Sequence, residues 1–226
     1  MPNILIISEK PTAALKIATA LADKEVVKKN NKNVPYYEIT HKGKKIIVAC
    51  AVGHLFGLKE VNGKGWTYPI FDYDWFPAYE INKEAKYTKI YIDTLKKLAK
   101  EANLYYNFCD VDTEGELIFR NILIFICKKE NAKRAYFSTL TKNDLVKAFE
   151  NAKDTINFGL ADAGEARHSM DFLFGINLSR ALTLSLKNIQ GGFSVLSIGR
   201  VQGPTLNFIV KKEKEIQAFI SKFYWE

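Results

Sequence analysis

The stretch DVDTEGE, residues 110–116, places four carboxylates within seven positions, directly after the apolar run LYYNFC at residues 104–109. Like charges this close repel each other unless a divalent cation or a shared proton neutralises them. The short aromatic run before the acids predicts a buried strand, and the apolar spacing in residues 114–128 predicts a helix after them. The acids therefore stand at the carboxyl end of a strand, which is the edge where α/β sheets bind ligands.

Ordinary helix chemistry explains only part of this stretch. Glu114 and Glu116 fall in the first turn of the predicted helix, where acidic side chains suit the positive end of the helix dipole. Asp110 and Asp112 need another explanation, because alternate positions at a strand exit can direct two oxygen ligands at one point. We therefore expect the two aspartates to belong to a cation site.

Composition favours an intracellular protein that binds a polyanion. Of the 226 residues 47% are hydrophobic, enough for one large domain or two smaller ones. Lys and Arg number 33 against 25 Asp and Glu, and this net charge of +8 favours nucleic acid before membrane as a partner. The cysteines are too widely spaced for a zinc knuckle. With no visible signal peptide and no apolar run near the ~18 residues of a membrane span, we expect a cytoplasmic protein without membrane attachment.

Strand and helix signals alternate through residue 152. The pattern predicts a strand at 4–7, a helix from Pro11, a hairpin of 36–40 with 44–51, an ordered loop at 53–76, a helix at 83–102, the strand and helix around the acidic stretch, a strand at 134–138, and a helix from Thr141 to 152 with Asp144 completing its cap. This order implies right-handed crossovers and a mainly parallel sheet covered by helices on both faces, an α/β fold.

The alternation stops at residues 151–158, and the chain then becomes helical. Residues 159–186 and 204–219 predict two helices, separated by a glycine-rich segment. We place a domain boundary near residue 155, so that residues 1–155 form the α/β domain. Residues 156–226 form a partial, mostly α-helical domain.

Four blocks stand in order along the chain, and each alone has an ordinary structural explanation. They are SEKP at residues 8–11, the acidic stretch at 110–116, AGEARHSMD at 163–171, and SIGRVQGPTL at 197–206. Together they resemble the type IA DNA topoisomerases, specifically the branch of archaeal topoisomerase I and topoisomerase III. The resemblance runs through nearly all of the chain, and it identifies the first domain as a Toprim domain.

The resemblance implies a role for each matching residue. It makes Glu9 the general acid toward the leaving 3′ oxygen, places Lys10 near the scissile phosphate, and counts Arg200 with them as catalytic. It implies that Asp110, Asp112 and Glu114 bind Mg²⁺. The residues expected to contact single-stranded DNA, or to lie beside that site, are His54 in the Gly-His-Leu element, Arg167, Asp171, Gln202 and Thr205.

The residue types suit transesterification of a phosphodiester, except that the nucleophile is missing. The reaction needs positive charge on the phosphate oxygens, a proton donor for the departing sugar oxygen, and an in-line nucleophile. Type IA enzymes attack with a tyrosine in a block resembling Ser-Tyr-Pro-Arg-Thr-Asp, and none of the eleven tyrosines here lies in such a block. We therefore expect an N-terminal part of this isomerase, inactive alone, that needs the rest of the enzyme in cis or in trans.

The expected partners are single-stranded DNA and negatively supercoiled duplex DNA, at the nucleoid. Two rival hypotheses remain. One is a Toprim nuclease or primase-like enzyme, in which water or a nucleotide hydroxyl replaces tyrosine; the other is a non-catalytic DNA-binding module. Neither accounts for the blocks at 163–171 and 197–206, which are not Toprim features.

Overall fold

The computed structural model describes residues 3–63 and 65–225. Contacts divide the chain into two compact units. Unit 1 comprises Met1–Lys59 and Asp74–Ala166, and unit 2 comprises Glu60–Tyr73 and Arg167–Glu226. The boundary expected near residue 155 stays a prediction.

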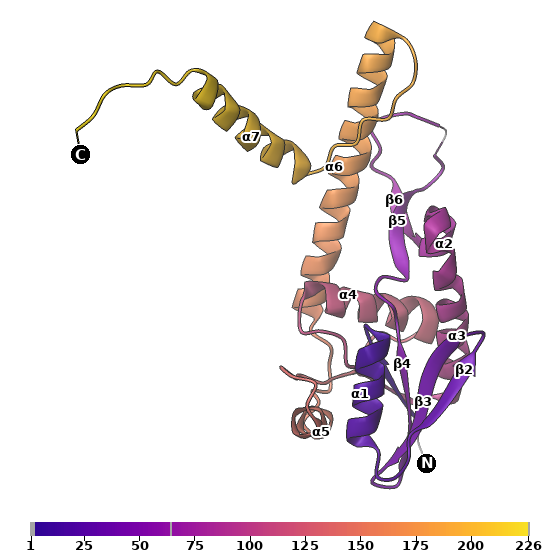
Figure 1. Cartoon of the computed structure of the whole chain (residues 1–226). Coiled ribbons are helices and arrows are strands. Elements are labelled where there is room, and N and C mark those ends of the chain that lie inside the picture. The colour runs from indigo at the N-terminus through magenta and orange to yellow at the C-terminus, as the bar shows by residue number, and fades with distance from the viewer. Residues whose placement is uncertain (1–2, 64, 226) are drawn as a thin grey trace. The chain divides into compact units, whose positions relative to one another are not determined.

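Unit 1 contains a six-stranded sheet in the order β2-β3-β4-β1-β7-β8; its strands β2, β3 and β4 are labelled in Figure 1. The pairs β4–β1, β1–β7 and β7–β8 are parallel, and β2–β3 and β3–β4 are antiparallel. The sheet is thus mostly parallel, as the alternating signals predict. Its strands are β1 (Ile4–Ser8), β2 (Val27–Asn31), β3 (Val34–His41), β4 (Lys44–Cys50), β7 (Leu104–Asn107) and β8 (Lys133–Arg134).

Helices cover both faces of this sheet, because its central strand is apolar on both sides. Ile4 and Ile6 of β1 pack in one core with α1 and α5, and Leu5 and Ile7 pack in a second core with α3, α4 and η2. All residues of β1 are buried. The helices are α1 (Pro11–Leu21), α3 (Thr88–Glu101), α4 (Thr113–Ile122), the π-helical turn η2 (Leu123–Cys127) and α5 (Lys142–Glu150).

Most predicted elements are confirmed, but three predictions in unit 1 are wrong in part. The helix expected at 83–102 begins as the 3₁₀ turn η1 (Lys83–Tyr87) before α3, and the strand expected at 134–138 is reduced to β8. The Thr141 side chain makes no capping bond. The Asp144 carboxylate instead accepts hydrogen bonds from the backbone N–H groups of Ser138 and Thr139, at 3.0 and 2.7 Å.

The region expected to be an ordered loop contains regular structure. Within residues 53–76, β5 (Phe56–Glu60) and β6 (Tyr73–Pro77) pair in a two-stranded sheet, and the short helix α2 (Ala78–Ile81) follows. Glycine and aromatic residues hide the period of these strands. The strand β2 was also missed, because its exposed lysine and asparagine side chains give no apolar alternation.

Unit 2 has two helices, α6 (Phe158–Gln190), which begins in unit 1, and α7 (Gln202–Gln217). Both were predicted. Side chains of α6 bind the backbone of two neighbouring segments. Asn177 accepts from the N–H of Ile70 at 2.6 Å and donates to its carbonyl at 2.9 Å. Ser179 does the same with Ile198, at 2.9 and 3.1 Å, so both segments are held along the helix.

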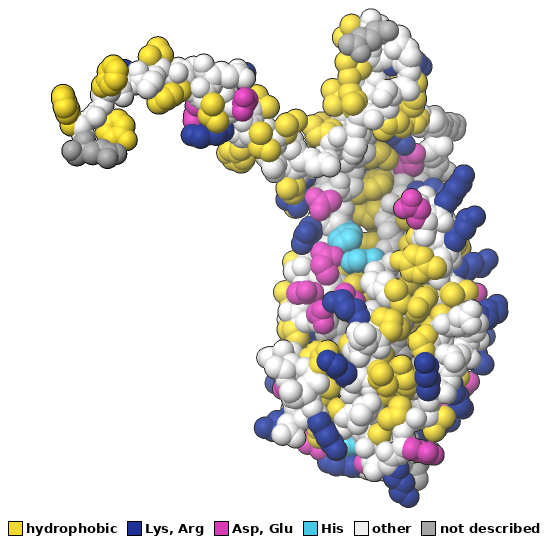
Figure 2. All heavy atoms as spheres, viewed as in Figure 1, with side chains coloured by type: hydrophobic (Ala, Val, Ile, Leu, Met, Phe, Trp, Pro, Cys, Tyr) yellow, Lys and Arg dark blue, Asp and Glu magenta, His cyan; other side chains and the backbone are white. Residues whose placement is uncertain are grey.

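The lysines of α3 form an exposed row in unit 1. Figure 2 shows Lys and Arg side chains along the side of the sheet that carries this helix. Lys89, Lys96, Lys97 and Lys100 are all exposed, as expected for a solvated helix face. Among the helices described, none combines the length and the apolar character needed to cross a bilayer.

Candidate functional site

The parallel pairing of β1 and β7 brings the first and second blocks together. Ile7 is opposite Asn107 in the register, so Glu9 and Asp110 both leave the sheet at its carboxyl edge. The Lys10 ammonium lies 3.1 Å from Asp110 Oδ2 and 3.4 Å from Glu9 Oε1. Its hydrogen bond to Asp110, together with the charge of Glu9, raises the pKa of Lys10. The three side chains form one charged group at the end of two adjacent strands.

The exit of β4 adds His54 to this edge. The backbone N–H groups of Ala51 and Val52 donate to the carbonyls of Ser8 and Glu9, at 2.9 and 2.7 Å. Val52 and Gly53 then take the left-handed conformation, with φ of 63° and 84°, and turn the chain sharply. His54 Nε2 lies 2.8 Å from Glu114 Oε2. The histidine predicted beside the site is therefore a direct partner of a predicted metal ligand.

The turn between β7 and α4 fixes the two aspartates. Asp112 is the N-cap of α4, and its Oδ1 accepts a hydrogen bond from the N–H of Gly115 at 2.7 Å. Gly115 is required here, because a Cβ at this position would overlap the carbonyl oxygen of Asp110. The acidic stretch thus closes tightly on itself, with Asp110 half exposed at its open side.

The fourth acid of the stretch belongs to the core. Glu116 is 0% exposed and pairs with Arg134, which is also 0% exposed. Asn107 donates a further hydrogen bond to Glu116 at 3.0 Å. Burial raises the pKa of Glu116, an effect that Arg134 and Asn107 oppose. Glu116 therefore neutralises a buried cation within the core.

Sequence reasoning missed Arg134 as part of this site. Its guanidinium donates to backbone carbonyls around the exit of β7, and so holds the chain that carries Asp110. The signal was a single basic residue at the start of the apolar run at 134–138. The carbonyls it contacts belong to Asn107 (3.3 Å), Cys109 (2.8 Å), Asp110 (2.9 Å) and Ala135 (2.9 Å).

The donor types at this edge suit a hard divalent cation, but the structure does not bring ligand atoms of Asp110, Asp112 and Glu114 all within 4.8 Å of one another. Asp110, Asp112 and Glu114 offer carboxylate oxygens, the ligands that Mg²⁺ prefers, and no thiolate stands among them. The side chains of Asp110 and Glu114 are 49% and 33% exposed, which leaves room for water and for a phosphate oxygen. Mg²⁺ usually keeps several water molecules as ligands when it is bound by few carboxylates.

The predicted strand-binding residues of unit 2 also come together in part. Arg200 Nε lies 2.6 Å from Asp171 Oδ1, and Arg167 Nε lies 3.9 Å from Asp171 Oδ2. The hydrogen bond from Arg200 holds the pKa of Asp171 below its ordinary value. Gln202 and Thr205 lie in the first turn of α7 and are exposed.

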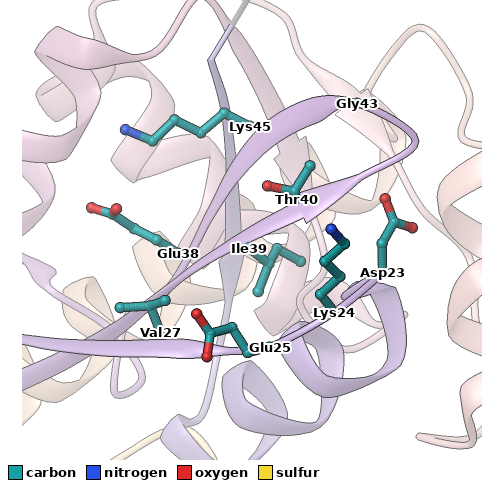
Figure 3. Close-up of a pocket in the computed structure, with 9 residues that line it drawn as sticks. All are labelled: Asp23, Lys24, Glu25, Val27, Glu38, Ile39, Thr40, Gly43 and Lys45. Atoms are coloured by element: carbon teal, nitrogen blue, oxygen red, sulfur yellow. The ribbon is translucent and has the colours of Figure 1, made fainter.

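A separate groove of about 510 Å³ lies between residues 23–27, which follow α1, and the β3–β4 hairpin (Figure 3). Its charged side chains are of both signs, and none of the predicted site residues lines it. The lining residues are Asp23, Lys24, Glu25, Val27, Glu38, Ile39, Thr40, Gly43 and Lys45.

Comparison with known families divides the chain in two. Residues 4–140 match the family described as Toprim domain, and residues 155–226 match the family described as DNA topoisomerase. The fold is similar to that of topoisomerase I from Thermotoga maritima, with a TM-score of 0.62 and 24% identity, over 96% of this chain and 31% of that one.

Curated relatives match over nearly the whole chain. DNA topoisomerase 1 of Pyrococcus horikoshii is 51% identical over 98% of this chain and 32% of that protein. DNA topoisomerase 1 of Methanocaldococcus jannaschii is 51% identical over 98% of this chain and 28% of that protein. DNA topoisomerase 3 of Haemophilus influenzae is 30% identical over 98% of this chain and 34% of that protein. The chain thus spans about a third of the length of these relatives.

Proposed function

The chain belongs to the Toprim-containing type IA DNA topoisomerases, and from that premise we propose that it supplies the metal site, the general acid and part of the strand-binding surface for reversible cleavage of one DNA strand. The observation that supports this most directly is the meeting of Glu9 and Lys10 with Asp110 at the carboxyl edge of the sheet. The substrates are single-stranded DNA and negatively supercoiled duplex DNA, and the protein acts at the nucleoid in the cytoplasm.

Asp110, Asp112 and Glu114 would hold Mg²⁺. When bound, the ion supplies positive charge to the phosphate oxygens during the reaction. The hydrogen bond from His54 orients Glu114 as a ligand, in the way that partners of metal-binding carboxylates usually do. Asp112 is held by its capping bond to the N–H of Gly115, which would fix the carboxylate in place for the ion.

Glu9 and Lys10 would act on the scissile phosphodiester. In the cleavage step a tyrosine oxygen bonds to phosphorus, the bond from phosphorus to the 3′ oxygen breaks, and the tyrosine hydroxyl releases its proton to water. Glu9 donates a proton to the departing oxygen, and Lys10 stabilises the phosphate charge. Rejoining reverses these steps. The tyrosine comes from the part of the enzyme that this chain does not contain.

Arg167, Asp171 and Arg200 would bind the strand next to the cleavage site. Asp171 lies beside both arginine side chains through its ion pairs, which would hold their positive charge in one place for a DNA phosphate. Gln202 and Thr205 contribute exposed polar groups from the first turn of α7. The family resemblance is the basis for counting Arg200 as catalytic as well.

The test is relaxation of a negatively supercoiled plasmid in Mg²⁺, by this chain with and without the tyrosine-bearing remainder of the enzyme. Relaxation and a 5′-phosphotyrosyl adduct only when both pieces are present would support the proposal. Nicking by the chain alone without a covalent adduct would favour a nuclease. DNA binding that is indifferent to Mg²⁺ and to Asp110→Asn with Asp112→Asn would favour a non-catalytic module.

A further inference from the structure

Gly164 lies where α6 passes close to the first turn of α4. A Cβ at this position would stand 2.6 Å from the carbonyl oxygen of Thr113 and 3.1 Å from Cβ of Leu117. Both distances are shorter than a normal contact, since non-bonded heavy atoms attract best at about 3.5–4.0 Å. The obstacles are a backbone atom and a Cβ, which cannot rotate away. Any side chain at residue 164 would therefore push the start of α4.

Ion pairs fix the same two helices beside this contact. Arg120 Nη1 lies 2.6 Å from Asp162 Oδ1 and 3.0 Å from Glu165 Oε2. Thr113, Leu117 and Arg120 lie on one face of α4, because residues three and four apart in a helix are neighbours. The start of α6 thus contacts α4 along about two turns, with Gly164 at the end that carries the acids.

Thr113 stands between the two acids that this helix contributes to the candidate metal site. Asp112 is the N-cap and Glu114 is the next residue after Thr113. We propose that Gly164 is a positioning residue for the metal site: its missing side chain sets the distance from α6 at which Asp112 and Glu114 can bind one divalent cation. This inference rests on the metal site of the proposed function, and it gives that site a determinant outside the acidic stretch.

The test compares Gly164→Ala with Gly175→Ala in the full chain. Both glycines lie inside α6, and a Cβ at Gly175 would meet no atom within 4 Å. The two variants gain the same intrinsic helix propensity. Mn²⁺ serves as the probe, with the free ion counted by electron paramagnetic resonance at a temperature where each variant is folded by circular dichroism. We expect the dissociation constant for Mn²⁺ to rise about tenfold in Gly164→Ala and to stay unchanged in Gly175→Ala.

Binding of a single-stranded oligonucleotide without metal separates positioning from general damage. We expect Gly164→Ala to keep the wild-type affinity for the oligonucleotide. Equal Mn²⁺ affinity in Gly164→Ala and wild type would overturn the inference. If Gly164→Ala does not fold, Arg120→Ala decides, because it loosens the same contact without overlap: weaker Mn²⁺ binding supports the inference, and unchanged binding overturns it. Failure of the proposed function would give a different result. In that case Asp110→Asn with Asp112→Asn would bind Mn²⁺ as the wild-type chain does, because these acids would not form the metal site.

Discussion

The two groups of predicted site residues are built in opposite ways. In unit 1, the acidic stretch is fixed by the guanidinium of Arg134, which is 0% exposed and donates hydrogen bonds to the backbone of the stretch. In unit 2, Asp171 and its two arginines form ion pairs whose side chains are between 35% and 56% exposed. A site that binds a small ion needs fixed ligands, whereas a surface that follows a flexible DNA strand can use exposed charges that solvent screens. The difference predicts unequal responses to substitution, salt and pH.

The largest effect is expected from Arg134→Ala in unit 1. The change leaves Glu116 buried without its cation and removes the hydrogen bonds to the carbonyls around the exit of β7. Removing one partner of a buried pair costs about 3–5 kcal/mol. Chemical denaturation should show a loss of this size in the free energy of unfolding.

A double variant sharpens this prediction. Arg134→Met with Glu116→Leu removes both charges, so it should recover part of the lost stability. A loss below about 1 kcal/mol in Arg134→Ala, which is the range of exposed ion pairs, would mean that this pair does not fix the acidic stretch, and the contrast between the units would fail.

An intermediate effect is expected from Asn177→Ala in unit 2. The change leaves both backbone groups of Ile70 without their side-chain partner. We expect a loss of about 1–2 kcal/mol in the free energy of unfolding. Asn188→Ala, at an exposed position of the same helix, is the matched control and should change stability little. Faster hydrogen exchange of the Ile70 amide in Asn177→Ala would locate the effect. Equal free energies of unfolding in Asn177→Ala and Asn188→Ala would contradict this prediction.

The smallest effect concerns the exposed ion pairs and is best seen as a function of pH. Because Arg200 lowers the pKa of Asp171, the pair stabilises the fold above the pKa of an unfolded aspartate. That stability is lost as the pH falls through the lower, folded value. Nuclear magnetic resonance titration of Asp171 should show its pKa rising in Arg200→Ala, and rising in wild type at high salt. A pKa of Asp171 that changes neither at high salt nor in Arg200→Ala would contradict an exposed ion pair between these two side chains.

The sequence predicts the two strands whose carboxyl ends carry Glu9 and the acidic stretch, because local signals and sheet topology agree there; metal binding by these residues stays a prediction. The apolar run before Asp110 and the strand at 4–7 are both confirmed, and parallel strands place their carboxyl ends at one edge. The different environments of Glu114 and Glu116 could not be predicted from the sequence. The two residues are only two positions apart in the chain, and the direction of each side chain depends on the helix phase and on Arg134. No local pattern contains that information, since Arg134 reaches the stretch through a strand of two residues.

The glycine contacts could not be read from the sequence either. Gly115 and Gly164 both look like ordinary helix-weakening residues, and only the packed structure reveals which backbone atoms lie against them. Similarly, the strands β5 and β6 form by pairing with each other across a loop, and neither has a strong period of its own. Long-range pairing overrides local propensity in these places.

The central claim, that Asp110, Asp112 and Glu114 form a Mg²⁺ site at the carboxyl edge of the sheet, is tested most directly by following backbone amide shifts during a Mg²⁺ titration. We predict saturable shifts concentrated at residues 8–10 and 110–115, which disappear in Asp110→Asn with Asp112→Asn. Asparagine keeps the helix cap at residue 112, so the fold should persist in that variant. Shifts that spread evenly over amides near exposed Asp and Glu side chains throughout the chain, or that survive the double substitution, would contradict the claim.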